Sequence, residues 1–575
     1  MNESFLSMRI SEQDASVSSR SIELLRPYIM DDNHSLVFFV GAGASMAGNT
    51  GIPSTPSLLY HLLLQALSSS GKFDLEQDNI SAIIKDITSY PCQIGFEVTL
   101  NDFWQICRQA TALLYESFAY IESKCMPNRV HAFLAYWLST GGTVITTNYD
   151  RLIEHELAKA GESIQSRYHE NGSNSFAEWK EDLNHGGTLF KIHGSLDDAN
   201  SCLGALEHVS TRLSGNREEL LEEIIRTRPL CFVGWQGVDP DIPALLYGRL
   251  DKRNSSLPTF WIHYEGNPPN STSLQKAIDN CPVLIKGYAE NQPILTEADR
   301  AFGKLLNWVG IVSKANPVRA SESFDFSKAI SKCTKTGLTR MVGITFRRAG
   351  NFVAAEQVLK VALELAETPG ERSASLQEIS LLRQQITGRE TDLARRFLKQ
   401  AREALKESPD LRLQLNTDFG LLSMTIVNIK SRPWLLPSIP RLFRRYRQSI
   451  EALRNEGIDK ESVALHESLL HLYKGRLRFK VLGWLGVIIR PLAKWILKPF
   501  DIARSTIEGA KDIHLHSHID VLAYRAVALS HFRQCQAVRE DVSEIERFIA
   551  ILNDDARTKH WKNQIKEIEH YCGKH

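Results

Sequence analysis

The sequence predicts an α/β domain with a doubly wound parallel sheet, followed by an all-α domain of helical repeats. Before residue 315, six short runs rich in β-branched and aromatic residues alternate with helical stretches. Each run ends in a polar or glycine-bearing turn. This pattern is typical of strands in a parallel sheet that are buried on both faces. After about residue 320 the strand signals vanish, and helix-period sequence continues to the end. The six runs are residues 35–43, 142–150, 187–195, 229–237, 258–266 and 281–289.

These patterns divide the chain into two expected domains. Alternating strands and helices predict a Rossmann-like domain at residues 1–315. A helical insertion, at about residues 60–135, separates the first strand from the second. The remaining residues, 316–575, are expected to form the helical domain.

Composition is that of an ordinary soluble globular chain. The 575 residues are 43% hydrophobic and 23% charged, and the net charge of +1 implies no global attraction to polyanions. Nine cysteines are scattered without a Cys-x-x-Cys pair, which favours reduced thiols over disulfides or a four-cysteine zinc site. Neither a secretion signal nor an apolar run of roughly 18 residues is present, so we expect a cytoplasmic protein.

A glycine-rich turn follows the first strand at once. Gly41, Ala42 and Gly43 are small enough to let the backbone approach a pyrophosphate at the start of the next helix. The dinucleotide fingerprint of dehydrogenases is not met, because Met46 stands where the third glycine belongs. The turn alone would also suit any tight strand-to-helix connection.

The later strand ends carry further polar and glycine-bearing turns. In an open parallel sheet all of these ends meet at the carboxyl edge, where ligands bind. A single such turn is usually structural, but four of them in one domain, counting the turn at Gly41–Gly43, indicate a ligand site. The residues concerned are Asn148 and Asp150, then His193 and Gly194, then Gly234, Gln236 and Asp239.

Taken in order, these motifs resemble those of the sirtuin family. Gly-Ala-Gly-x-Ser at 41–45 is followed by Gly-Ile-Pro at 51–53, Thr-x-Asn-x-Asp at 146–150 and His-Gly at 193–194. The resemblance covers roughly residues 25–295. The segments TTNYDRLIE and FKIHGSLDD are most similar to those of the bacterial defence-associated sirtuin-like branch.

The resemblance implies that the chain binds NAD and breaks the bond between nicotinamide and ribose. Asn148 would order the ribose and a water molecule, and His193 would accept a proton near neutral pH. The resemblance places the phosphates at the first turn, the nicotinamide end at the Gly-Ile-Pro loop and Asp150, and the adenosine side at the turn after residue 233. The implied NAD contacts are Gly41, Ala42, Gly43, Ser45, Ile52, Pro53, Asp150, Gly234, Gln236 and Asp239.

Departures from the family pattern bear on the reaction. Only Cys202 and Cys231 lie near the interval that holds the zinc module of classical sirtuins, so we expect no zinc. Without that module the platform for an acyl-lysine peptide is missing, and water becomes the favoured acceptor. We therefore expect NAD hydrolysis to nicotinamide and ADP-ribose. An NAD-dependent deacylase or ADP-ribosyltransferase and a non-catalytic NAD or ADP-ribose sensor stay open as alternatives.

The helical half resembles degenerate tetratricopeptide repeats. Small and apolar residues recur 39 positions apart, which is longer than the ideal period of about 34. Stacked helical repeats form surfaces suited to a protein partner. Packed helical hairpins that bind no ligand would show the same sequence pattern. The residues are Gly350, Ala355, Leu359 and Ala362, then Ala394, Leu398 and Ala401.

Two basic segments interrupt the repeats. Residues 430–448 are basic, aromatic and broken by proline, and residues 474–500 contain no acidic residue. They could contact an anionic membrane, nucleic acid or an acidic partner, or form a buried hairpin with snorkelling lysines.

The resemblance to defence sirtuins also implies a biological role. An enzyme that destroys NAD must be restrained until it is needed. We expect the protein to be an effector of abortive infection and to form a homo-oligomer. We also expect a phage-derived or system-encoded protein to bind the helical domain and trigger the enzyme.

Overall fold

The computed structural model divides into two compact units, which are described separately. Unit 1 comprises Met1–Leu58 and Gln109–Ala329, and unit 2 comprises Leu59–Arg108 and Ile330–His575. Most of the expected insertion thus falls in unit 2 with the carboxy-terminal helices, whereas the boundary at residue 315 stays a prediction. The structure describes residues 22–31, 33–46, 50–53, 55–73, 79–88, 96–106, 108–162, 165–167, 176–198, 201–202, 216–235, 257–262, 295–311, 324–387, 392–429, 431–457, 460–488, 490–508, 515–549, 561–563, 565–566 and 568.

Unit 1 contains a six-stranded sheet in the order β3-β4-β2-β1-β5-β6, and every neighbouring pair is parallel. This confirms the predicted fold class. Five of the six predicted runs contain strands, and the sixth, 281–289, lies outside the described residues. The strands are β1 (Val37–Val40), β2 (Thr143–Thr146), β3 (Gln165–Arg167), β4 (Thr188–Lys191), β5 (Leu230–Val233) and β6 (Thr259–Ile262).

The pattern did not predict β3. Its three residues, Gln-Ser-Arg, are polar, and among the described strands it lies at the edge of the sheet and pairs with β4 alone. An edge strand needs no apolar run on both faces, so it carries no hydrophobic signal.

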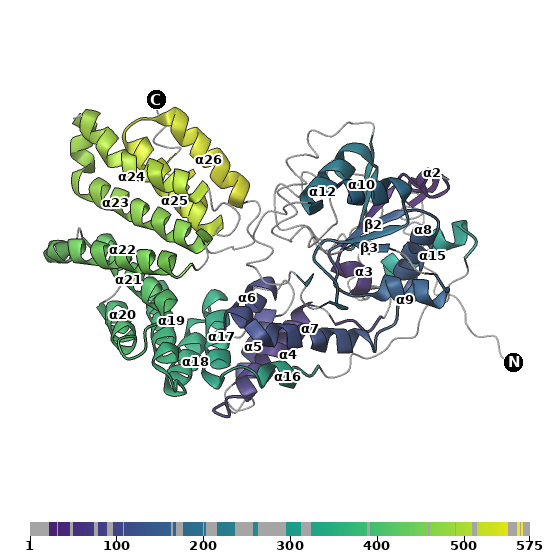
Figure 1. The fold of residues 1–575 in the computed structure, drawn as a ribbon, viewed down its shortest axis with the longest axis horizontal. Coiled ribbons are helices and arrows are strands. Elements are labelled where there is room, and N and C mark those ends of the chain that lie inside the picture. Colours follow the sequence, from purple (N-terminus) through teal and green to yellow (C-terminus); the bar gives the residue numbers. More distant parts are fainter. Residues whose placement is uncertain are drawn as a thin grey trace. The chain divides into compact units, whose positions relative to one another are not determined.

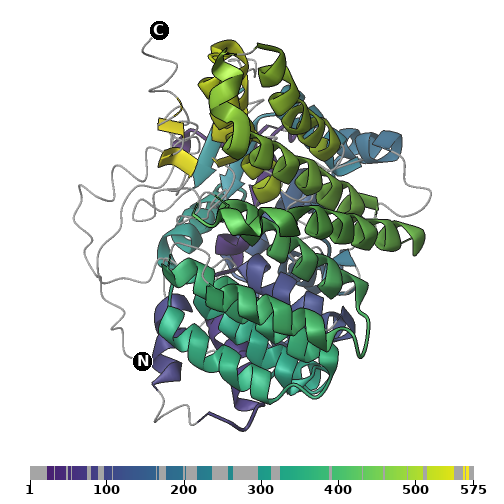
Figure 2. The ribbon, with the colours of Figure 1, turned by 90° about the vertical axis from the view of Figure 1, so that its left-hand side faces the viewer.

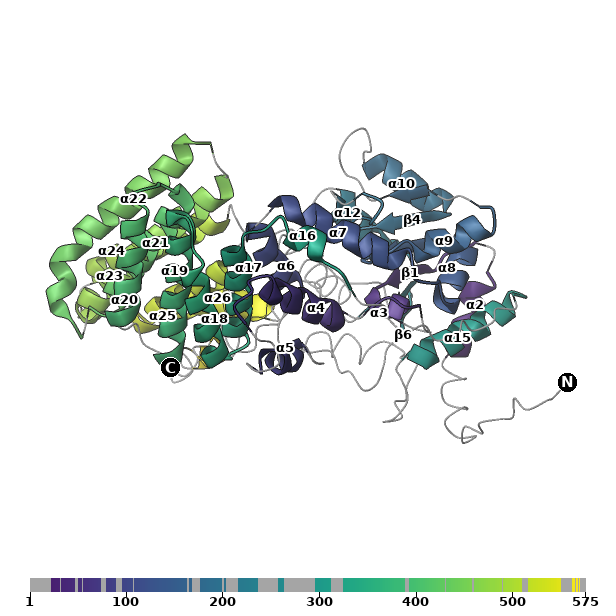
Figure 3. The same cartoon turned by 90° about the horizontal axis from the view of Figure 1, so that it is seen from below.

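Helices cover both faces of the sheet (Figure 3). Phe38 and Val40 of β1 pack with α8 and α15 on one face. Val37 and Phe39 pack with α10 and α12 on the other. The helices of unit 1 are α2 (Arg26–Ile29), α3 (Ala42–Met46), α7 (Arg108–Glu122), α8 (Arg129–Ser139), α9 (Leu152–Lys159), α10 (Phe176–His185), α12 (Asn216–Thr227), α15 (Leu295–Trp308) and α16 (Ser327–Ile330); α7 and α16 each extend by one residue across the division between the units.

Unit 2 is helical, and its carboxy-terminal helices follow one another in sequence order (Figures 1 and 2). Consecutive helices pack in pairs from α17–α18 to α25–α26. The elements are α4 (Thr55–Ser68), α5 (Ile80–Thr88), α6 (Phe96–Ile106), α17 (Lys335–Arg348), α18 (Phe352–Glu364), α19 (Pro369–Thr387), α20 (Asp392–Ala404), α21 (Leu411–Val427), the 3-10 helix η3 (Pro433–Ser438), α22 (Ile439–Asn455), α23 (Lys460–Ile488), α24 (Arg490–Glu508), α25 (Leu515–His531) and α26 (Cys535–Ile549).

Six of the seven positions of the predicted repeats lie on buried faces of α18 and α20. The expectation for Gly350 is wrong, because it is exposed in the turn before α18 and a Cβ atom there would meet nothing within 4 Å. A Cβ atom on Gly343 would lie 2.7 Å from Leu359 Cγ, and one on Gly420 would lie 2.9 Å from Leu398 Cδ1. The repeated positions in α18 and α20, from Ala355 to Ala401, are all buried. A repeat relationship and a protein ligand stay predictions.

The first basic segment forms η3 and most of α22. Leu442 and Tyr446 of α22 are buried, while Arg441, Arg444 and Arg447 are exposed. In the second segment the Arg478 guanidinium lies 3.7 Å from the Trp495 ring centroid. Within the described part of the chain no helix is long and apolar enough to cross a membrane. The ligand of either segment stays a prediction.

The inserted helix α6 packs against α17 of the same unit. A Cβ atom on Gly337 would lie only 2.5 Å from Ile106 Cγ2, so the two helices are in close contact. Asp102 and Arg348 form an ion pair of 2.6 Å between them, in which the Asp102 side chain is 10% exposed. Burial raises the pKa of Asp102 to about 6, and the Arg348 charge opposes that shift.

Replacing Arg348 with methionine should destabilise unit 2 by about 3 kcal/mol, because it leaves a buried carboxylate without its partner. The matched control is Lys328→Met, which breaks the exposed Lys328–Glu116 pair and should cost less than about 1 kcal/mol. Hydrogen exchange of peptides from α6 and α17 measures the effect. Equal protection in both variants would show that the Asp102 pair does not hold the insertion.

Candidate active site

The turns after four neighbouring strands begin side by side at the carboxyl edge of the sheet. β4, β2, β1 and β5 are adjacent in this order. The chain leaves β1 toward β2 on one side, and it reaches β5 on the other side of β1. The boundary between β1 and β5 is therefore a topological switch point, where ligands of open α/β sheets bind.

The turn after β1 packs directly on the turn after β5. A Cβ atom on Gly43 would lie 2.7 Å from the Gly234 oxygen, and one on Gly234, which has φ +60°, would lie 2.2 Å from Ala44 N. Only glycine fits these positions. The amides of Gly41, Gly43 and Ala44 donate to the carbonyls of Val233, Gly234 and Gly41 at 2.9, 2.8 and 3.0 Å. These glycines thus serve the close approach of the two turns.

The buried Ser45 hydroxyl joins three elements. Its Oγ lies 2.7 Å from Asp150 Oδ2, 3.0 Å from Asn148 Nδ2 and 3.1 Å from His131 Nε2. A carboxylate only accepts and an amide nitrogen only donates, so the hydroxyl donates to Asp150 and accepts from Asn148. These contacts connect α3, the turn after β2 and α8.

The amide of Asn148 has a defined orientation. Its Nδ2 donates to Gly41 O at 3.2 Å and to Ser45 Oγ at 3.0 Å. Because a carbonyl oxygen cannot donate, the nitrogen must face Gly41, and Oδ1 must face away from it. Within the described residues no donor reaches Oδ1. The half-buried Asn148 therefore presents a hydrogen-bond acceptor at the carboxyl edge.

Both carboxylate oxygens of Asp150 have donors. Oδ2 accepts from Ser45, and Oδ1 accepts from the amide of Leu152, the first residue of α9, at 3.2 Å. A negative charge is favourable at the amino end of a helix. Asp150 thus anchors the turn after β2 to α9 while it orients Ser45.

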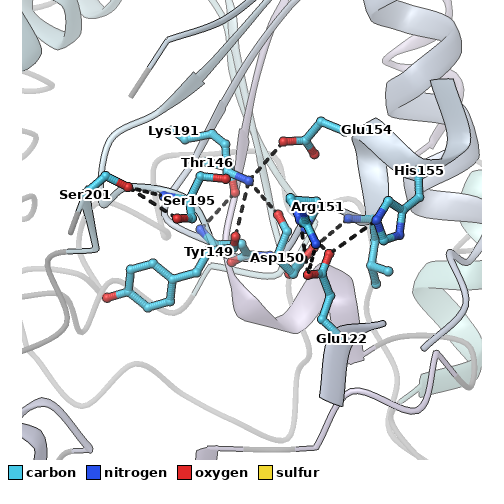
Figure 4. A network of polar contacts seen from close by, with 12 residues as sticks. Glu122, Thr146, Tyr149, Asp150, Arg151, Glu154, His155, Lys191, Ser195 and Ser201 are labelled. Atoms are coloured by element: carbon cyan, nitrogen blue, oxygen red, sulfur yellow. Dashed lines mark hydrogen bonds and ion pairs between the residues drawn. The ribbon is translucent and has the colours of Figure 1, made fainter. Parts of the chain in front are cut away.

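Lys191, the last residue of β4, supports the same turn (Figure 4). Its fully buried ammonium donates to Asp150 O at 2.7 Å, Glu154 Oε1 at 3.0 Å and Tyr149 O at 3.3 Å. Three N–H groups meet three acceptors, so the buried charge is fully hydrogen-bonded. The ammonium therefore holds the backbone of Tyr149 and Asp150 in place.

A second buried charge, Glu122 at the end of α7, holds the next residue (Figure 4). Its Oε1 accepts from Arg151 N at 2.7 Å, and its Oε2 accepts from Arg151 Nη2 at 3.2 Å. His155 Nε2 lies 3.7 Å from Oε1. Burial raises the pKa of Glu122, and the Arg151 guanidinium opposes the shift.

His193 lies on the turn after β4, beside the turn that carries Asn148. Ile192 N donates to Thr146 O at 3.0 Å, and Leu196 N donates to Tyr149 O at 3.0 Å. These bonds hold the backbone on both sides of the buried His193 against residues 146–149. Gly194 has φ +96°, and a Cβ atom there would lie 2.1 Å from Ser201 O, so the tight turn requires glycine.

The Gly-Ile-Pro loop is tied to Ser45 through Thr50. The Thr50 hydroxyl donates to Ser45 O and accepts from Ile52 N at 3.1 Å. Thr50 O accepts from Met126 N at 2.8 Å. These hydrogen bonds therefore hold the start of the Gly-Ile-Pro loop beside Ser45.

The structure brings half of the twelve predicted site residues together, and their individual roles in binding or catalysis stay predictions. His193 lies on the adjacent turn, Ile52 and buried Pro53 follow Thr50, and Ala42 is exposed in α3. Gln236 and Asp239 lie outside the described residues. The residues in mutual contact are Gly41, Gly43, Ser45, Asn148, Asp150 and Gly234.

Sequence reasoning missed the residues that support the site. His131 forms a capping box with Asn128: Asn128 Oδ1 accepts from His131 N, and His131 Nδ1 accepts from Asn128 N. The Asn-x-x-His spacing carries the signal of such a box, although Glu or Gln is usual at the last position. Lys191 and Glu122 have no local signal, since their partners lie on other elements.

Stability of unit 1 should fall in acid because of His131. Burial lowers the pKa of His131 from 6.5 to about 4, although the Asp150 charge acts in the opposite direction. The folded protein thus binds fewer protons than the unfolded chain between these values, and stability is lost as pH falls through this window. Relative to His131→Gln, which keeps an acceptor for Asn128 N, the parent should lose about 2.5 kcal/mol between pH 7.5 and 4.5.

Hydrogen exchange of peptides from α8 and β2 measures this difference at each pH. Comparison with the glutamine variant cancels the opposite contribution of Asp102, whose pKa is raised. A parent and variant that lose protection in parallel would exclude a neutral His131 as the cause.

Comparison with known proteins adds a family relationship for part of the chain. Residues 142–283 match the family model of the SIR2-like domain. The match includes Asn148, Asp150, His193 and Gly234, whereas the Ser45 turn precedes it and joins the site through the fold. A search of curated proteins found no match. Residues 142–283 therefore carry a SIR2-like domain, which indicates an NAD-related activity.

Proposed function

We propose that this chain is an NAD glycohydrolase that converts NAD and water to nicotinamide and ADP-ribose. The observation that carries the proposal is the oriented Asn148 amide in a SIR2-like domain. Ser45 and Gly41 hold its nitrogen, so its oxygen is left to accept a hydrogen bond from a ribose hydroxyl or a water molecule.

The residues at the edge suit this substrate. The glycines let the turns after β1 and β5 approach each other closely at the switch point, beside which a dinucleotide would lie. Departure of nicotinamide with the bonding electrons places positive charge on the ribose, and water then adds to the same carbon. An imidazole such as His193 can accept a proton from water or a ribose hydroxyl near neutral pH.

Hydrolysis is favoured over deacylation because the sequence lacks the cysteines of the zinc module, and with them the platform for an acyl-lysine peptide. Within the part of the chain that the structure describes, no group of three or more His, Cys, Asp or Glu side chains is placed to hold a metal ion. The absence of zinc from the whole protein stays a prediction. Deacylation and NAD sensing are outcomes that the experiment below distinguishes.

We also propose that unit 2 controls the site, as an effector of abortive infection requires. The chain enters unit 2 within α4, which starts two residues after Pro53. It returns at the start of α7, which ends at Glu122, the residue that binds Arg151. Two of the three chain crossings between the units, at 58/59 and 108/109, thus lie in helices that lead to Pro53 and Glu122, and the third is at 329/330. A phage-derived or system-encoded protein is the proposed trigger, and homo-oligomer formation is a further proposal.

Asn148→Ala and His193→Ala should each lower nicotinamide release from NAD by at least about 100-fold, because each removes a group that acts on the reacting ribose or water. Matched controls are Asn307→Ala and His185→Ala, two exposed residues of the same unit, which should keep parental activity. Release is measured by chromatography with purified protein, and NAD content is measured in producing cells during phage infection.

Other results would contradict the proposal in identifiable ways. Site variants that release nicotinamide like the parent would show that the site is wrong. Release that requires an acyl-lysine peptide would indicate a deacylase, and NAD binding without release in both settings would indicate a sensor.

A further inference from the structure

We propose that His131 and Ser45 form a positioning relay that orients Asn148 for the reaction. The inference rests on the proposed function for its kinetic readout, but its hydrogen bonds are testable by themselves. It also changes the role of Ser45, which sequence reasoning assigned to phosphate binding.

The relay begins with the way α8 starts. Asn128 caps the helix, and its Nδ2 donates to Ala44 O at 2.8 Å, which ties the start of α8 to α3. The Asn128 amide donates to His131 Nδ1 at 3.1 Å. The imidazole is therefore held at the helix start, and its Nε2 faces Ser45.

The Asn128 amide also decides where the imidazole carries its proton. A backbone N–H can only donate, so Nδ1 must be the unprotonated nitrogen. The neutral ring then carries its hydrogen on Nε2 and donates it to Ser45 Oγ. The charged and titratable groups whose charges influence the pKa of His131 are Asp150 after β2, and His155 and Lys159 on α9.

The Ser45 hydroxyl is fully used by this arrangement. It accepts from His131 and Asn148 and donates to Asp150, which accounts for one hydrogen and two lone pairs. No proton or lone pair is left for a substrate. Ser45 is thus a positioning residue, and it receives its orientation from a histidine 86 positions away in the chain.

The end of the relay is the amide of Asn148. Its nitrogen has two acceptors, Gly41 O and Ser45 Oγ, which fix the plane of the amide and the direction of Oδ1. Without the hydroxyl only one contact would remain, and the amide could rotate about its last torsion. Misplacement of a reacting group mainly lowers turnover rather than substrate binding.

The kinetic test compares Ser45→Ala, His131→Leu and the double variant for nicotinamide release. Each single variant should lower kcat by about 10- to 100-fold with little change in KM. The double variant should be no slower than the slower single one, because His131 acts only through Ser45. His131→Gln should recover most of the lost kcat, since its amide can accept from Asn128 N and donate to Ser45. His185→Leu, at an exposed position, is the control.

Multiplied losses in the double variant, or a loss that lies in KM, would overturn the relay. Nitrogen NMR of the histidine-labelled parent at pH 7.5 provides the readout that does not depend on activity. The expected spectrum shows a neutral His131 with hydrogen on Nε2, and hydrogen on Nδ1 would overturn the relay. A parent that releases no nicotinamide but shows this tautomer would remove the proposed function and leave the relay geometry in place.

Discussion

The hydroxyl of Ser45 is the point at which the separate parts of the candidate site meet. It lies in the short helix α3 after β1, and its three partners come from α8 and from the turn after β2. A buried hydroxyl that lost one of these partners would leave a polar group unsatisfied, which costs free energy in a low-dielectric interior. The positions of Asn148, Asp150 and His131 are therefore coupled to one another. This coupling also depends on the glycine contact between the turns after β1 and β5, since that contact sets where α3 begins.

Two buried charges, Lys191 and Glu122, support the turn after β2. Lys191 binds the backbone of Tyr149 and Asp150, and Glu122 binds the backbone of Arg151 (Figure 4). Each charge binds at least one main-chain group of the turn as well as side chains, so both help to define the path of the chain. A buried charge must have such partners to be tolerated at all. The turn after β2 is thus held at three successive residues, which suits a turn that must keep one amide in one orientation.

The insertion folds with the helical half of the chain and not with the α/β domain. By sequence position it belongs to the α/β domain, yet residues 59–108 pack with the carboxy-terminal helices. The close contact of Ile106 with Gly337 and the Asp102–Arg348 pair show why: α6 completes a helical layer with α17. The insertion is joined to unit 1 through α4, which follows Pro53, and through α7, which ends at Glu122, so it provides a covalent route between the candidate site and unit 2. This route supports the proposed control of NAD cleavage by the helical unit.

The sequence by itself determined the sheet, the class of both halves and most positions of the turns. Apolar runs and glycine-bearing turns are local signals, so five strands and the residues at their carboxyl ends could be located from the pattern alone. It could not locate β3, whose polar residues at the sheet edge carry no such signal. Only the tertiary structure decided which side chains meet. Ser45 and Asp150 are 105 positions apart, and Ser45 and His131 are 86 apart. Hydrogen-bond partners at such separations are selected by the packing of whole elements, and no local periodicity records them.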